Sequence, residues 1–140
     1  MLRILIIQTY IKILKVKAGL TFVKIREVVK ILDACVVTST ENFDDIEINS
    51  ACGADLMSDV MAYVKENVLL LTGLVSPQVI RTAEMMDIKV VVFVRGKKPG
   101  QNIIDLAAEK GICVLTTHHP LYIACGKLYS AGLTGRGVWD

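Results

Sequence analysis

Three short apolar runs in the second half of the chain predict the strands of a parallel sheet. They are Val68–Leu71, Val90–Val94 and Ile112–Leu115, and none of them contains a charged or hydroxyl-bearing residue. Unbroken apolar runs of this length are typical of strands that are covered on both faces. Each run is followed by a polar turn, a proline and a segment with helical spacing of apolar residues. We therefore predict consecutive strand–helix units.

The three prolines of the chain mark this repeat. Pro77, Pro99 and Pro120 lie 22 and 21 residues apart (99 − 77 and 120 − 99). Proline suits the first turn of a helix, because its missing N–H has no helical partner there, so we expect each proline to open a helix. Gly111 and Gly132 are the expected stops of the second and third helices. The apolar stripes of the three helices are Val79, Ile80, Ala83 and Met86; Ile103, Ile104, Ala107 and Ala108; and Leu121, Ala124, Cys125 and Leu128.

The first half of the chain predicts two more helices and two short strands. Phe22–Leu32 is the first helix, with Thr21 as a candidate N-cap. Ala54–Val64 is the second, with Asp55 in its first turn and a buried side made of Leu56, Met57, Val60, Met61 and Val64. The strands are Ala34–Thr38 and Ile46–Ile48.

The chain length of 140 residues fits one domain. We expect a single α/β domain over residues 20–133, with a short, mainly parallel sheet of repeated βα units flanked by helices, and a flexible tail over 134–140. Residues 1–19 form an N-terminal extension, apolar but interrupted by basic residues and too short to span a bilayer. It could be a basic amphipathic helix at a membrane surface. Alternatively, the native start is at Val16 or Leu20, and the preceding residues result from a gene start assigned too far upstream.

Charge and cysteine content narrow the class of protein. Sixteen basic and fourteen acidic residues give a formal charge of +2, too small a bias to indicate nucleic acid or a membrane as partner. The four cysteines form no Cys-x-x-Cys pair, so we expect reduced thiols in a cytoplasmic protein without a cofactor. Cys52, near the predicted start of a helix, would have a stabilised thiolate and is a candidate redox sensor.

The strongest candidate for chemistry is the loop set that follows the three predicted strands. Ligands of open parallel sheets bind beyond the carboxyl ends of the strands, beside helix N-termini. The residues placed there offer hydroxyls, glycines and cations, a combination suited to a phosphate, a nucleotide or a carboxylate metabolite. These candidate ligand-binding residues are Thr72, Gly73, Ser76, Arg95, Gly96, Lys97, Thr116, Thr117 and His118.

The same residues also allow simpler interpretations. The hydroxyls could only cap helices and the cations could only be solvated, since neither Gly-x-Gly-x-x-Gly nor a P-loop is present. We expect no metal at His118 and His119, because adjacent histidines rarely converge on one ion. The segment Asp55, Met57, Ser58, Asp59 and Met61 is a candidate interface, although its acids could simply complement the helix dipole.

Several separated motifs resemble the DRTGG domain family. They are Cys52–Ala62, Leu69–Leu74, Pro77–Glu84, Val92–Lys97 and Ala124–Leu133, in this order along the chain. The pentapeptide that names the family is absent; Thr72-Gly73 is its nearest remnant. The resemblance implies a fold similar to the N-terminal domain of HPr kinase, and a role in regulation and dimer contacts rather than catalysis.

The expected function is therefore a non-catalytic regulatory module. It would form a homodimer and could bind a small anionic metabolite or a nucleotide. Two alternatives remain: an adaptor for a partner enzyme without a ligand of its own, and a small transferase-type enzyme. No nucleophile–base pair is visible in the sequence to favour the enzyme.

Overall fold

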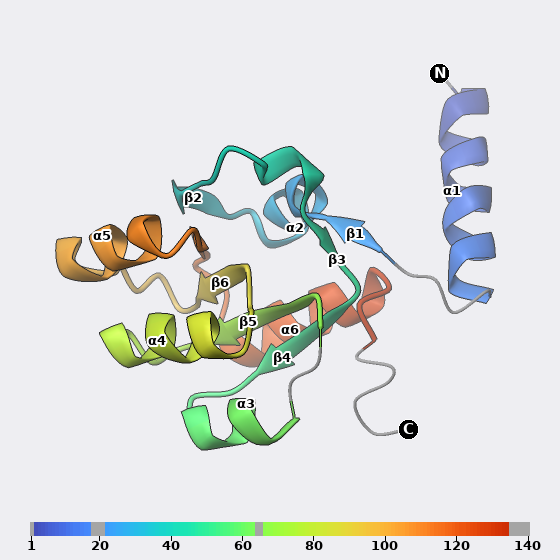
Figure 1. The fold of residues 1–140 in the computed structure, drawn as a ribbon. Helices are drawn as coiled ribbons and strands as arrows, with labels where there is room; N and C mark the ends of the chain where they lie inside the picture. Colours follow the sequence, from blue (N-terminus) through green and yellow to red (C-terminus); the bar gives the residue numbers. More distant parts are fainter. Residues whose placement is uncertain (1, 18–21, 64–65, 135–140) are drawn as a thin grey trace.

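The computed structural model describes residues 2–17, 22–63 and 66–134, and its centre is a five-stranded sheet (Figure 1). The strand order is β2-β7-β6-β5-β4. β4, β5, β6 and β7 are parallel, and β2 is antiparallel to β7 at one edge. The short, mainly parallel sheet expected from the apolar runs is confirmed. The strands are β2 (Cys35–Thr38), β4 (Ser50–Gly53), β5 (Val68–Thr72), β6 (Val90–Phe93) and β7 (Cys113–Thr116).

Helices cover both faces of this sheet. On one face lie α2 (Ile25–Leu32) and α6 (Leu121–Ser130), which contact each other. On the other face lie α3 (Met57–Tyr63), α4 (Pro77–Met85) and α5 (Gln101–Glu109). The strands β5, β6 and β7 are therefore buried on both sides, which is why their sequences carry no alternation of apolar and polar residues.

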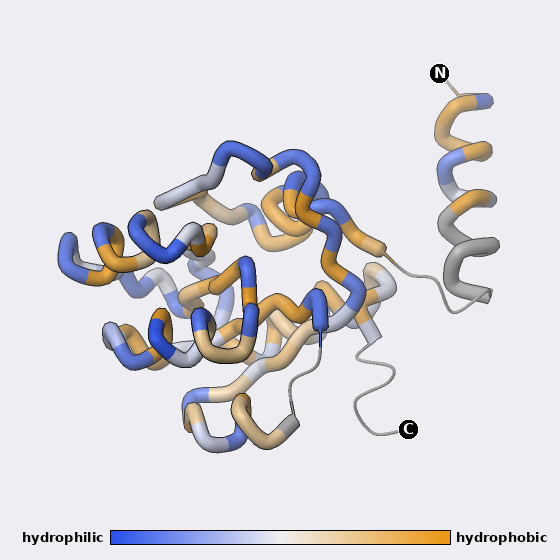
Figure 2. The backbone as a smooth tube through the Cα atoms, viewed as in Figure 1, coloured by the Kyte–Doolittle hydropathy of each residue, from blue (hydrophilic) through white to orange (hydrophobic). Residues whose placement is uncertain are grey.

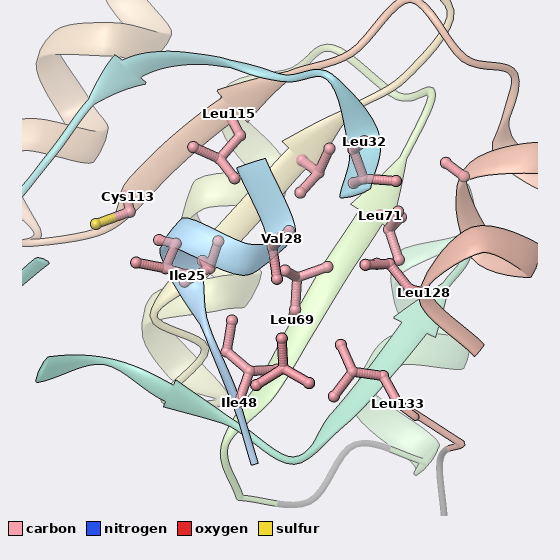
Figure 3. Close-up of a cluster of buried hydrophobic side chains, with 14 of the residues drawn as sticks. Ile25, Val28, Leu32, Ile48, Leu69, Leu71, Cys113, Leu115, Leu128 and Leu133 are labelled. Carbon is pink, nitrogen blue, oxygen red and sulfur yellow. The ribbon is translucent and has the colours of Figure 1, made fainter. Parts of the chain in front are cut away.

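The two faces of β5 show how one strand serves two cores. Leu69 and Leu71 point to the α2 and α6 side, whereas Leu70 packs with α3 and α4 on the other side. All three side chains are fully buried. Figure 3 shows Leu69 and Leu71 meeting Val28 of α2 and Leu128 of α6 in the first of these cores.

A small ribbon closes one end of the first core. β1 (Val23–Lys24) pairs antiparallel with β3 (Glu47–Ile48), and the side chains of Val23 and Ile48 are buried there. The 3-10 turn η1 (Phe43–Asp45) precedes β3, and Asp44 in it forms an ion pair with Arg26 of α2. This exposed pair ties the loop to the helix.

Helix α1 (Leu2–Lys17) lies apart from the domain (Figure 1). Its first turns are mainly apolar (Figure 2), and Leu2, Ile4 and Tyr10 are exposed. Among the described residues, no helix combines the length and the apolar character needed to cross a membrane.

Contrary to the prediction from the sequence, the three helices that follow a proline do not all begin at that proline. Pro77 is the first residue of α4, as expected. Pro99, however, precedes Gly100, the N-cap of α5, and Pro120 is itself the N-cap of α6. The prolines thus mark the helix entrances, but only one of the three lies inside a helix, because extended backbone also suits proline before the first turn.

Three other expectations for the first half are corrected. The first helix begins at Ile25, after the residues of β1, with Lys24 as its N-cap; Thr21 lies outside the described residues. The second helix begins at Met57 rather than Ala54, and Leu56 is exposed instead of buried. The edge strand β4 was not predicted. Val64 and residues 135–140 of the expected tail lie outside the described part of the chain.

Candidate functional site

The loops after β5, β6 and β7 leave the sheet at the same edge, which we call the rim. Backbone hydrogen bonds continue the ladder beyond the strands at this edge. The Val94 N–H donates to the Thr72 carbonyl at 3.1 Å, and the Thr117 N–H donates to the Phe93 carbonyl at 3.0 Å. The rim brings together the candidate residues of all three loops, because β5, β6 and β7 are parallel and end at the same edge of the sheet.

The loop after β6 is a tight turn with unusual backbone angles. Arg95 and Gly96 have φ values of +61° and +66°, and the Lys97 N–H donates to the Val94 carbonyl at 3.3 Å. A turn with two positive central φ values suits glycine, and a left-handed conformation costs roughly 1–2 kcal/mol for any other residue. Arg95 therefore adopts a conformation that its own chemistry disfavours.

The turn is held by the loop after β7. The Arg95 N–H donates to the His119 carbonyl at 2.9 Å, and the Gly96 N–H donates to the Thr117 carbonyl at the same distance. These two bonds satisfy the backbone donors of the turn. The side chain of Arg95 is exposed and available to a ligand.

The loop after β5 is organised by Asp55, a residue from the segment between β4 and α3. Asp55 Oδ1 accepts from the Gly73 N–H at 2.7 Å and from the Thr72 hydroxyl at 3.3 Å. The Lys97 ammonium donates to the Gly73 carbonyl at 2.6 Å. Asp55 and Lys97 thus bind opposite ends of the Gly73 residue, one through its N–H and one through its carbonyl.

Three of the candidate hydroxyls already have structural partners. Thr72 is fully buried, and its hydroxyl also accepts from the Leu74 N–H at 3.1 Å. Ser76 is the N-cap of α4 and accepts from the Gln78 N–H at 3.2 Å. The buried Thr117 hydroxyl donates to the Leu32 carbonyl at 2.6 Å. Thr116, the last residue of β7, is half-buried beside them.

The two histidines follow Thr117 at the entrance of α6. Their ring centroids are 4.2 Å apart. Partial desolvation, followed by the neighbouring His118 and Lys127, holds the pKa of His119 below its usual value, against the opposing effect of Asp33. Among the described residues no group of three His, Cys, Asp or Glu side chains is placed to hold a metal ion.

The charged groups at the rim are the cations Arg95, Lys97 and Lys98 and the exposed carboxylate of Asp55, which is bonded to Gly73. Arg95, Gly96, Lys98 and His118 are exposed, and Lys97 is half-buried between the loops. Guanidinium, ammonium and imidazole groups beside an exposed backbone favour phosphate or carboxylate as ligand. The rim is therefore suited to an anion, although its hydroxyls are used to build the loops.

Two surface hollows lie elsewhere in the described structure. One, of about 270 Å³, is near the opposite ends of β5 and β6 and is lined partly by Asn67 and Lys89. The other, of about 790 Å³, is a broad depression along α6 that we call the α6 hollow. Its lining residues are Ile31, Tyr122, Ile123, Cys125, Gly126, Lys127, Tyr129, Ser130 and Ala131. No pattern in the sequence distinguished these α6 residues from an ordinary solvated face.

The candidate interface residues of the α3 segment have different environments. Met57 is buried in the core and cannot form a surface. Asp55 lies before α3, where it binds the Gly73 loop, and not in a first helical turn as expected. Ser58, Asp59 and Met61 are exposed.

The expectation of a stabilised thiolate at Cys52 is wrong. Cys52 is the third residue of β4, and burial, with a smaller effect of Asp59, raises the pKa of its thiol. Burial likewise raises the pKa of Cys125 on α6. Both thiols are therefore less ionised at neutral pH than an exposed cysteine.

Comparisons with known proteins agree with this architecture. The family model described as "DRTGG domain" matches residues 27–128. A solved structure that matches comprises the CBS and DRTGG domains of the regulatory region of Clostridium perfringens pyrophosphatase, complexed with the activator diadenosine tetraphosphate. The identity is 17% and the TM-score 0.63, over 74% of this chain and 45% of that one, so the likeness is one of fold. No curated protein matches the chain.

Proposed function

Because this chain belongs to the DRTGG domain family, we propose that it is a non-catalytic regulatory module that binds a small anionic metabolite or nucleotide and associates with a second copy of itself. The ligand site of this proposal is the rim. In this proposal, binding of the ligand would change the activity of an enzyme that the module regulates.

The observation that carries the proposal is the fixed turn at Arg95. A non-glycine residue in a left-handed conformation is disfavoured, and such conformations cluster at functional sites. Here two backbone bonds from the β7 loop hold the turn, and the side chains of Arg95 and Lys98 are exposed next to this anchored backbone. In the proposal the guanidinium binds the anion, with Gly96, Lys97 and Thr116 around it; Thr72, Gly73, Ser76 and Thr117 build the loops.

The related pyrophosphatase region guides the choice of ligands. That protein is complexed with a dinucleoside polyphosphate, an elongated and highly charged anion. The rim of this chain offers three cations, Arg95, Lys97 and Lys98, from the loop after β6, which fits a ligand with more than one phosphate. We therefore select diadenosine tetraphosphate, ATP, acetyl phosphate and inorganic phosphate as probes.

The test is ligand binding to the full chain, followed by thermal shift and calorimetry. A ligand at 100 times its dissociation constant stabilises the folded state by about 2.7 kcal/mol, so the Tm should rise by several degrees. Arg95→Gly removes the guanidinium while suiting the turn, and it should weaken binding at least tenfold. Lys89→Gln, at the opposite end of β6, is the matched control and should leave binding unchanged.

Two results would count against the rim. A wild-type chain whose Tm none of the four probes raises has no site for them. Equal binding by wild type and Arg95→Gly would place the ligand elsewhere on the molecule.

A further inference from the structure

We propose that a second copy of this chain docks on the outward face of α6, with Gly126 at the centre of the contact. This inference rests on the self-association proposed above and names its interface. It differs from the α3 segment that the sequence suggested.

The outward face of α6 has a depression centred on Gly126. Ala124 and Leu128 are buried against the sheet, and Gly126, two residues from each, points the opposite way. On a helix surface the nearest neighbours of a residue are those three and four positions away. For Gly126 these are Tyr122, Ile123, Tyr129 and Ser130, all exposed, and together they frame a hole with no side chain at its centre.

Nothing in the described part of the chain explains a glycine at this position. A Cβ added at Gly126 would meet no atom of these residues within 4 Å. At Gly53, by contrast, an added Cβ would lie 2.5 Å from Cys125 Sγ, so that any other residue there would have to displace this thiol. Glycine in the middle of a helix lowers its stability relative to alanine. The space above Gly126 therefore fits an atom from outside the chain, as in knobs-into-holes packing.

The area and charge of the face suit a protein interface. Tyr122 is 86% exposed, Tyr129 61% and Ile123 44%. Since an aromatic side chain can bury about 150–250 Å², the two tyrosines alone offer roughly 300 Å², about half of what each partner buries in the smaller specific interfaces. Among the described residues that line the α6 hollow, Lys127 alone is charged. Interface cores are likewise depleted of charge and rich in tyrosine.

A second copy fits this face because the face is self-complementary. It carries both a hole, at Gly126, and large side chains on either side of it along the helix, at Tyr122 and Tyr129. In a two-fold contact each copy supplies the same patch, so the tyrosines of one helix can pack beside the glycine of the other. Neither α3 nor the described part of α1 combines these two features.

The experiment measures the oligomeric state and the stability of the full chain in the same variants. Sedimentation equilibrium over a concentration series should show a monomer–dimer equilibrium for the wild type. Gly126→Ala should raise the dissociation constant at least tenfold, while it raises the Tm by a few degrees at concentrations where the chain is monomeric. Gly126→Leu, which fills the hole, and Tyr122→Ala should weaken the dimer at least as much.

Control variants distinguish this face from others. Met85→Ala removes a side chain that is 67% exposed on α4, and it should leave the dissociation constant unchanged. Met61→Ala tests α3, and Ile4→Asp tests α1. If either of these dissociates a dimer that the Gly126 variants leave intact, the α6 interface is wrong while self-association stands. A wild type that is monomeric at every concentration would remove self-association itself, and ligand binding at the rim would be judged separately.

Discussion

The carboxylate of Asp55 holds the loop after β5, a role that its position in the sequence does not reveal. It accepts hydrogen bonds from the Gly73 N–H and the Thr72 hydroxyl, both in a buried loop 17 or 18 residues away. A buried donor that loses its acceptor costs about 1–3 kcal/mol. The loop after β5 therefore depends on a residue that belongs to a different segment.

Asp55→Ala should lower the free energy of unfolding by about 1–2 kcal/mol, because two buried donors lose their acceptor. Urea unfolding measures this change. Asp59→Ala, on the first turn of α3, is the control and should cost no more than about 0.5 kcal/mol. Equal losses in the two variants would mean that Asp55 acts only as a negative charge near the helix, as the sequence suggested.

Single residues were the level at which the sequence was least informative. The run Ala54-Asp55-Leu56 has the composition of a helix start, so it was assigned to one. What removes it from the helix is the bond to Gly73, a long-range contact that no local pattern reveals. The same holds for the Thr117 hydroxyl, whose acceptor, the Leu32 carbonyl, lies 85 residues away.

Whole elements were more predictable, because the burial of a helix or strand leaves a recognisable pattern of apolar residues in its sequence. β5, β6 and β7 were found from their apolar runs, since strands covered on both faces need apolar residues throughout. Strand β4 is not predicted from the sequence, because Ser50–Gly53 contains no β-branched or aromatic residue. It also lies at an edge of the sheet, where it pairs with one neighbouring strand. The entrance of α5 was placed near Pro99, within two residues of its observed start.

Gly111 follows Lys110, the C-cap of helix α5, and its role can be tested directly. Gly111 has φ +67°, and its N–H donates to the Ala108 carbonyl at 3.3 Å. Gly111→Ala should therefore reduce the free energy of unfolding by about 1 kcal/mol, although an added Cβ would meet no neighbour within 4 Å. Gly111→Asn should cost less, since asparagine tolerates this conformation better. A loss that is the same for both residues would contradict the backbone explanation.

At the scale of the molecule, the rim follows from topology alone. Three parallel strands joined by right-handed crossovers must direct their following loops to one edge. This is why the sequence could gather Thr72, Arg95 and Thr116 without any contact information. It could not show which hydroxyls of these loops are bonded within the protein, because their partners, such as Asp55 and the Leu32 carbonyl, are distant in the sequence.

His119 links this assembly to pH, because it lies where the β7 loop, α6 and the end of α2 meet. Its folded pKa lies below the unfolded value of 6.5, so between the two pKa values the unfolded chain binds more protons. The free energy of unfolding should therefore rise with pH through this window and level off above about pH 6.5. Denaturant unfolding between pH 5 and 7.5 measures this rise, which should be smaller in His119→Gln. Identical pH profiles would contradict the assignment.

The left-handed turn at Arg95 has a consequence for recognition. Its backbone is anchored before any ligand arrives, so association would require little rearrangement and lose little conformational freedom. Selectivity would then depend on whether a compound's own charges match a preset spacing. Conformationally rigid analogues of a ligand should therefore retain affinity for the anchored turn at Arg95. A flexible loop at this position would instead bind ligands of many shapes with similar affinity.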